Sequence, residues 1–191
     1  MFSHRSLACR SLLGCAVVAV ALVLCGPLAG CAVGRRHTSD AQLEKRFLQH
    51  EVEFEALLDT ARSDSKLVTI SRSLVIYDGQ RVNIDAAALS GGEPIGLAGF
   101  SWKWYLTKLQ SLGLEGGVLK GRDSVEFRVD AGSLQNGDSY KGYEFSNAVP
   151  AHLRKSLDEC RLSDLDRDQF GNGIARKHIK GNWYLYLFVN R

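Results

Sequence analysis

The sequence predicts an α+β domain in which a long N-terminal amphipathic helix and a second helix pack on a mainly antiparallel sheet. Three observations lead to this fold class. Apolar residues recur every three or four positions over residues 39–61 and 101–112, which is the period of a helix. Short apolar runs, many of them rich in β-branched residues, recur between residue 66 and residue 189. Tight-turn sequences such as Asp78-Gly79 separate some of these runs, which is typical of hairpins.

The first thirty residues have the pattern of an export signal. Arg5 and Arg10 give a positive start, and residues 12–24 form an apolar run. As a helix this run rises about 20 Å, which is short of the ~30 Å hydrocarbon core of a bilayer. We therefore interpret residues 1–30 as a signal peptide. An uncleaved signal anchor over about residues 12–33 is the alternative.

The leader ends in the tetrapeptide Leu28-Ala29-Gly30-Cys31, which resembles the lipobox of bacterial lipoprotein precursors. The resemblance implies a diacylglycerol on the Cys31 sulfur, cleavage before Cys31, and N-acylation of the new terminus. Two or three acyl chains anchor a protein stably, whereas one is marginal. Ala32 follows the lipid site, which implies passage to the outer membrane with the domain facing the periplasm.

Charge and cysteine content fit an exported single domain. Loss of Arg5 and Arg10 leaves 22 basic residues against 21 acidic ones, so the formal charge falls from +3 to +1. A charge so close to neutral argues against nucleic acid as a partner. Cys160 remains as the free thiol, so no disulfide holds the fold. We assign residues 31–38 to the lipidated cysteine and its tether, and residues 39–191 to one domain.

The long helix is expected over residues 39–61, with Ser39 or Asp40 as its N-cap. Its apolar stripe consists of Leu43, Phe47, His50, Phe54, Leu57 and Ala61. The second helix, residues 101–112, begins after a serine cap and stops at a glycine. A third, short helix is expected over residues 151–162.

Strands are expected over residues 66–70, 73–77, 81–84, 116–121, 124–130, 140–146, 174–179 and 183–189. Val125, Phe127 and Val129 alternate with charged residues, which is typical of a sheet with one wet face. The last run, "WYLYLFV", is apolar on both faces, so we expect it inside the sheet.

From about Phe47 to its end, the chain resembles a group of uncharacterised bacterial proteins that are often lipoproteins. The resemblance rests on "EFEALLDTARSDSKLVTI", "WYLTKLQSLGLEGGV", "KGYEF" and "NWYLYLF". In that group the helix before "LGLEGG" carries arginines, whereas this chain has Leu106 and Thr107 there. The resemblance implies no reaction and no catalytic residues.

No motif of the sequence identifies a catalytic residue, and we expect neither a metal site nor a cofactor. The histidines are scattered without the spacing of zinc ligands. Cys160 with His152 or His178 could supply a thiol nucleophile and its base. Cys160 falls on the apolar side of a short amphipathic segment, however, and a buried structural thiol is the simpler interpretation.

The strongest candidate for a binding site is a polar and aromatic patch on adjacent strands. Its members are Lys141, Tyr143, His178, Trp183 and Tyr184, with Gly142 and Lys177 beside them. Aromatic rings supply contact area and cations supply direction, which suits a glycan, a peptide or a protein surface. The alternative is that these residues are only the edge and the core of the sheet.

These observations predict a bacterial envelope lipoprotein whose domain binds a partner, either an envelope protein or a glycan, without catalysing a reaction. An envelope hydrolase with an unrecognised site is the first alternative. A small inhibitor or immunity protein is the second, and it would use residues 85–100 as a loop that inserts into its target.

Overall fold

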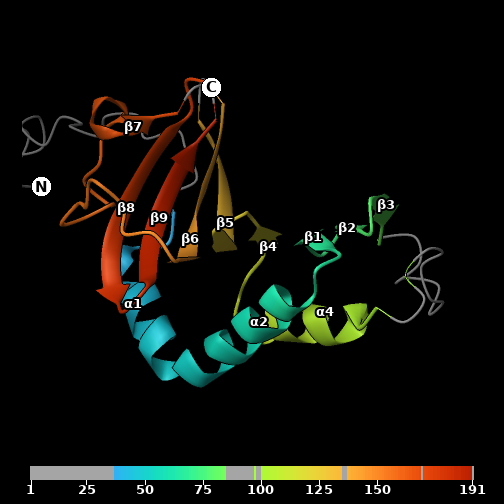
Figure 1. Cartoon of the computed structure of the whole chain (residues 1–191). Coiled ribbons are helices and arrows are strands. Elements are labelled where there is room, and N and C mark those ends of the chain that lie inside the picture. The colour runs from blue at the N-terminus through green and yellow to red at the C-terminus, as the bar shows by residue number, and fades with distance from the viewer. Residues whose placement is uncertain (1–36, 85–96, 98–99, 135–136, 169, 191) are drawn as a thin grey trace, which may run out of the picture. The chain divides into compact units, whose positions relative to one another are not determined.

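The computed structural model describes residues 37–84, 97, 100–134, 137–168 and 170–190. Within these residues a nine-stranded antiparallel sheet dominates, and three short α-helices accompany it (Figure 1). The helices are α1 (Asp40–Gln49), α2 (Glu51–Ser63) and α4 (Trp102–Ser111). The prediction of an α+β fold built on a long N-terminal helix is therefore wrong: the described part is mostly sheet, and none of its helices is long.

The strands pair in the order β3-β2-β1-β4-β5-β6-β9-β8-β7, and every neighbouring pair is antiparallel. Their bounds are β1 (Leu67–Ile70), β2 (Leu74–Tyr77), β3 (Gln80–Asn83), β4 (Gly117–Lys120), β5 (Ser124–Leu134), β6 (Gly137–Ser146), β7 (Asp166–Arg167), β8 (Gly173–Lys180) and β9 (Trp183–Val189). The apolar last strand, β9, lies between β6 and β8, inside the sheet.

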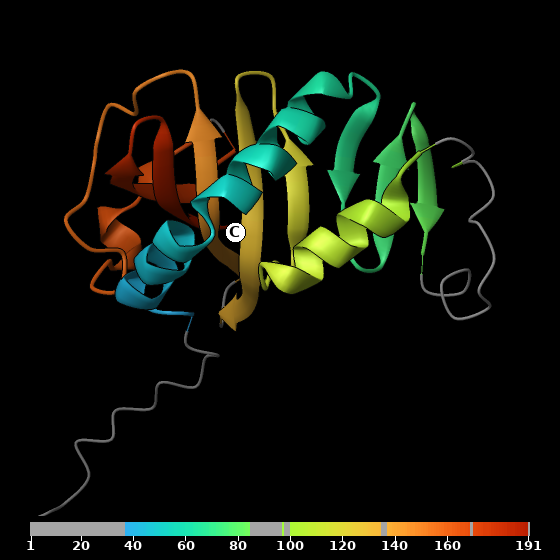
Figure 2. The same ribbon diagram turned by 90° about the horizontal axis from the view of Figure 1, so that it is seen from below.

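The expected long helix is broken at His50 (Figure 2). The backbone of His50 has φ −126° and ψ 24°, and its amide donates to the carbonyls of Arg46 and Phe47, which ends α1. The apolar stripe survives the break because Phe47 and Phe54 both point to the sheet, with ring centroids 5.4 Å apart. His50, the remaining residue of the stripe, is half-buried, with Nδ1 3.6 Å from Glu53 Oε1. Periodicity thus predicted which residues are buried but not where the helix ends.

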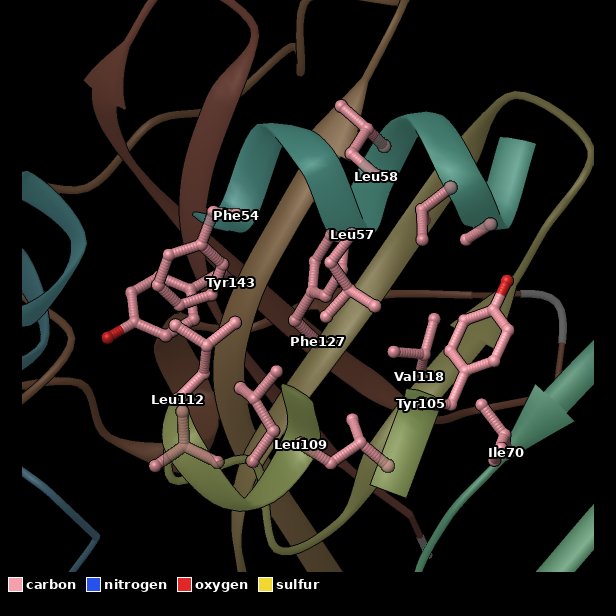
Figure 3. Packing of buried hydrophobic residues seen from close by; sticks show 14 of the residues in the cluster. Phe54, Leu57, Leu58, Ile70, Tyr105, Leu109, Leu112, Val118, Phe127 and Tyr143 are labelled. Atoms are coloured by element: carbon pink, nitrogen blue, oxygen red, sulfur yellow. The ribbon is translucent and has the colours of Figure 1, made fainter. Parts of the chain in front are cut away.

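All three helices lie on one face of the sheet, and the main core is packed between the helices and that face (Figures 2 and 3). Phe54 and Leu57 from α2 and Leu109 from α4 point toward the strands in Figure 3. Phe54 is the hub of an aromatic cluster, with its ring centroid 4.7 Å from that of Tyr143 and 6.0 Å from those of Phe127 and Trp183. Burial of this aromatic surface is the main source of stability on this face.

The expected short helix over residues 151–162 is absent. This segment is irregular, with one β-bridge from Leu153 to Arg176 and a 3-10 turn at Leu162–Asp164. Its backbone amides bond elsewhere: the Arg154 amide donates to the Arg176 carbonyl, and the Leu157 amide donates to the Asp40 carboxylate. Tertiary partners replace the hydrogen bonds that a helix would have made.

Candidate functional site

The structure divides the five predicted patch residues between the two faces of the sheet. Tyr143 and Trp183 face the helices and belong to the aromatic core, and Lys141 lies buried on the same side. Tyr184 and His178 are cross-strand partners on the other face, with ring centroids 5.5 Å apart. The five residues therefore do not form one continuous surface.

Lys141 is the centre of a buried charge cluster rather than a surface cation. Its side chain is 2% exposed, and its Nζ lies 2.7 Å from Asp40 Oδ1 and 2.5 Å from Asp158 Oδ1. Asp158 also accepts the Asp40 backbone amide at 2.9 Å. Lys177 extends the cluster, with Nζ 2.7 Å from Glu44 Oε1 and 3.6 Å from Asp40 Oδ2.

This cluster joins the start of α1 to β6, to β8 and to the segment after β6. Burial raises the pKa of Asp40, but the hydrogen bonds from Lys141 and from the Leu157 amide, with the charge of Lys177, outweigh it and hold the pKa below 3.8. The carboxylate therefore stays ionised and paired near neutral pH. Lys141 and Asp40 are enclosed and paired with each other, whereas the Asp158 side chain is 41% exposed, so the cluster ties these segments together and presents no unpaired buried cation to a ligand.

A second polar cluster holds the chain where it enters the domain. His37 Nδ1 lies 2.5 Å from Asp130 Oδ1 on β5, and His37 Nε2 lies 2.8 Å from Ser139 Oγ on β6. The Thr38 amide donates to the second oxygen of Asp130 at 2.6 Å. His37 and Thr38, which were expected to belong to the tether, are thus hydrogen-bonded to side chains of β5 and β6.

The distances within this cluster match a serine, histidine and aspartate triad, but its surroundings do not. Ser139 is 0% exposed, so its hydroxyl has no open path to an acyl substrate. Burial raises the pKa of Asp130, but the hydrogen bonds from His37 and Thr38 outweigh it and keep the pKa below 3.8. The geometry therefore holds His37 and Thr38 against β5 and β6 and does not present an accessible nucleophile; we call this cluster the latch.

The cysteine alternative has no support in the geometry either. Burial raises the pKa of the Cys160 thiol, and its sulfur donates to the Ser156 carbonyl at 3.3 Å. A thiol with a raised pKa is a poor nucleophile near neutral pH.

The face of the sheet away from the helices carries a distinct array of side chains, which we call the uncovered face. It consists of Glu126, Arg128, Tyr140, Glu144, Ile174, Arg176, His178, Tyr184, Tyr186 and Phe188. Two of its guanidinium groups are fixed by two hydrogen bonds each. Arg128 donates Nε and Nη2 to Glu126 Oε2, and Arg176 donates Nε and Nη2 to Glu144.

Gly142 and Tyr186 organise the middle of the uncovered face. Arg128, Gly142, Tyr186 and Arg176 form one cross-strand row over β5, β6, β9 and β8. Because Gly142 has no side chain, no side chain separates Arg128 from Tyr186 in this row. Arg128 also stacks on Tyr140, with its guanidinium carbon 4.6 Å from the ring centroid. Tyr186 is fully buried under these neighbours, although all three helices lie on the other side.

The predicted patch contains two of the ten residues of the uncovered face, His178 and Tyr184, and misses the other eight. Sequence reasoning selected these two because aromatic and cationic types stood together, and it treated "SVEFRVD" as a strand with a wet face. The cross-strand registers that join Arg128 to Arg176 through Tyr186 span two other strands. Such long-range pairings have no signal in a single sequence. His37 was passed over for the same reason, since its partner Asp130 is 93 residues away.

No family model, curated protein or solved structure matches the chain. Among the residues that the structure describes, no three or more His, Cys, Asp and Glu side chains are grouped to hold a metal ion. In the same residues no helix has both the length and the apolar character to cross a membrane. The insertion loop considered for an inhibitor, residues 85–100, falls mostly outside the described residues.

Proposed function

We propose that the protein is a lipid-anchored protein of the bacterial cell envelope whose domain binds a glycan through its uncovered face and catalyses no reaction. The anchor is the expected acylation of Cys31 in the Leu28-Ala29-Gly30-Cys31 sequence. The observation that carries the binding role is the array of fixed guanidinium groups and aromatic rings on the uncovered face.

The charges of the uncovered face favour a neutral ligand. Arg128 and Arg176 each pair with a carboxylate on the same face, so the array has no strong field for a polyanion. Both guanidinium groups use Nε and Nη2 in these pairs, which leaves the donors of Nη1 outside them. Fixed donors and acceptors of this kind suit the hydroxyl groups of a sugar chain.

The aromatic rings supply the apolar part of such a site. Tyr140 and Phe188 are half-buried neighbours with ring centroids 6.3 Å apart and planes inclined by 31°. His178 is exposed beside Tyr184, which enlarges the area that a ligand could cover. The combination of rigid rings with oriented polar groups is typical of specific binding surfaces.

Co-sedimentation of the full chain, purified in detergent, with isolated cell-wall glycan tests the binding. We expect a double variant, Arg128→Lys with Arg176→Lys, to bind about 10-fold more weakly, because lysine keeps the charge but loses the planar fork. The matched control is Arg62→Lys with Arg81→Lys, two exposed arginines outside the uncovered face. The proposal is contradicted if the parent does not sediment with the glycan, or if the parent, the double variant and the control sediment equally. If the parent binds only to envelope proteins and not to the glycan, the partner is a protein instead.

The anchor has its own test. Intact-mass spectrometry of protein extracted from membranes should show loss of residues 1–30 and a diacylglycerol or triacyl mass on Cys31. A Cys31→Ser variant should keep its leader and lack the lipid mass. Extracted protein that carries a bare Cys31 thiol would rule out the anchor while leaving the binding test untouched.

The hydrolase alternative retains one observation in its favour, which is the triad-like spacing of Ser139, His37 and Asp130. A fluorophosphonate probe distinguishes the two functions, because it labels only an accessible activated serine. We expect no labelling of Ser139. Labelling that disappears in Ser139→Ala would overturn the non-catalytic proposal.

A further inference from the structure

A shallow hollow of about 230 Å³ lies on the helix side of the molecule, apart from the uncovered face. It is lined by Thr38, Arg46, Gly113, Glu115, Val129 and Asp130, which come from the segment before α1, from α1, from the turn after α4 and from β5. Its volume is below the ~300–1,000 Å³ of pockets for drug-sized ligands, so it suits a much smaller molecule.

Arg46 brings unused hydrogen-bonding capacity to this hollow. Its guanidinium has five N–H donors, yet the one hydrogen bond that it donates to the described residues runs from Nη1 to the Gly113 carbonyl at 3.5 Å, the outer limit of such a bond. Among the described residues no carboxylate lies within 4.0 Å of it, in contrast to Arg128 and Arg176. A half-buried guanidinium with so few partners is a ready site for a carboxylate.

The turn after α4 is shaped around this guanidinium. Gly113 has φ +65°, a conformation that glycine adopts without strain. A Cβ at this position would lie 2.9 Å from Arg46 Nη1, so a larger residue would displace the guanidinium. Gly113 therefore serves both the helix stop and the placement of Arg46.

The two carboxylates that line the hollow differ in whether they already have partners. Asp130 is occupied by His37 and by the Thr38 amide. Glu115 is exposed and has no ion pair among the described residues. Val129 is buried and adds an apolar part to the lining. The hollow thus offers a cation and an anion without an ion-pair partner among the described residues, Arg46 and Glu115, and an apolar contact at Val129.

We infer that this hollow is a binding site for a small zwitterion of amino-acid size, with its carboxylate on Arg46 and its ammonium on Glu115. Arg46 and Glu115 carry charges of opposite sign, so a ligand with one charge of each sign pairs with both, whereas a simple anion leaves Glu115 unpaired and a simple cation leaves Arg46 unpaired.

Isothermal titration calorimetry of the full chain in detergent tests this site with L-alanine as the probe. We expect binding with a dissociation constant of about 1 mM or tighter, and at least about 10-fold weaker binding of acetate and of methylammonium. Absence of heat with L-alanine would overturn the proposal, as would acetate or methylammonium binding as tightly as L-alanine.

Two variants locate the ligand. Arg46→Gln and Glu115→Gln should each weaken L-alanine binding at least about 10-fold, because each removes one charged partner. The matched control is Lys45→Gln, an exposed neighbour on the same helix, which should bind as the parent does. If Arg46→Gln does not fold, Glu115→Gln decides alone, since Glu115 is exposed on a turn. Unchanged binding in Glu115→Gln overturns the assignment.

Discussion

The two faces of the sheet are built from the same strands but stabilised in different ways. On the helix side, β9 contributes Trp183 to an aromatic cluster that contains Phe47 and Phe54 from the helices. On the uncovered face, the alternate residues Tyr184 and Tyr186 of β9 are buried under neighbouring strand side chains. The comparison shows that a strand can be buried on both sides with helices on only one.

The difference originates in the residues next to β9. On the helix side β5 and β6 present Phe127 and Tyr143, whose rings pack directly. On the other side the same strands present Arg128 and Glu144, whose long side chains form ion pairs with Glu126 and Arg176. Packing of rings gives one face its stability, whereas a polar network gives the other face hydrogen-bonding groups that a ligand can use.

The largest expected effect comes from Phe54, the hub of the aromatic face. Phe54→Ala should lower the free energy of unfolding by about 3–5 kcal/mol, because it removes the ring that contacts Phe47, Phe127, Tyr143 and Trp183 and leaves a cavity. Urea unfolding measures this loss. Val52→Ala, two residues earlier and 79% exposed, should change the free energy by no more than about 0.5 kcal/mol. A similar small loss for both variants would show that the aromatic cluster does not stabilise the domain.

The next largest effect concerns the charge cluster around Lys141 on the helix side of the sheet. Lys141→Met should cost about 3 kcal/mol, because the buried Asp40 carboxylate loses its nearest cation and keeps only Lys177, whose Nζ lies 3.6 Å away. Lys155→Met, at an exposed position in the segment after β6, is the control and should have little effect. Urea unfolding again reports the difference. A loss below about 1 kcal/mol would mean that water solvates Asp40 once Lys141 is gone, and would contradict the burial of the Lys141–Asp40 pair.

The uncovered face should respond less to the loss of a charge. Arg176→Met removes the partner of Glu144, which is 3% exposed, but Arg176 itself is one-quarter exposed and admits water. We expect a loss of about 1–2 kcal/mol. Arg122→Met, in the exposed turn between β4 and β5, should be neutral in the same denaturation experiment. If Arg176→Met lowers the free energy of unfolding as much as Lys141→Met does, the two polar networks do not differ in their contribution to stability.

Local features of the fold could be predicted from the sequence, because their causes are local. The Asp78-Gly79 turn is present, with φ 51° and 74° for its two residues, and it joins β2 to β3. The two-sided apolar pattern of β9 correctly placed that strand inside the sheet. In these cases the side-chain pattern and the backbone preference lie within one short segment.

The features that could not be predicted depend on partners far along the chain. The break at His50 leaves the apolar stripe intact, so periodicity does not reveal it. The pairing of β1 with β4 and of β6 with β9 brings together strands that are distant in sequence. The candidate hollow at Arg46 is a consequence of such pairings, because its walls come from four separate segments. Sequence types can suggest a binding surface, but cross-strand register decides which side chains share it.

The smallest expected effect concerns the latch at His37. Because the pKa of Asp130 is lowered in the folded state, its contribution to stability is complete above 3.8, the ordinary value, and is lost as the pH falls below it. In urea unfolding, Asp130→Asn should therefore be less stable than the parent at neutral pH, and the gap should shrink as the pH falls below 3.8. Asp123→Asn, in an exposed turn, should follow the parent at every pH. A gap between Asp130→Asn and the parent that does not change with pH would show that the ionised carboxylate does not hold the entering chain.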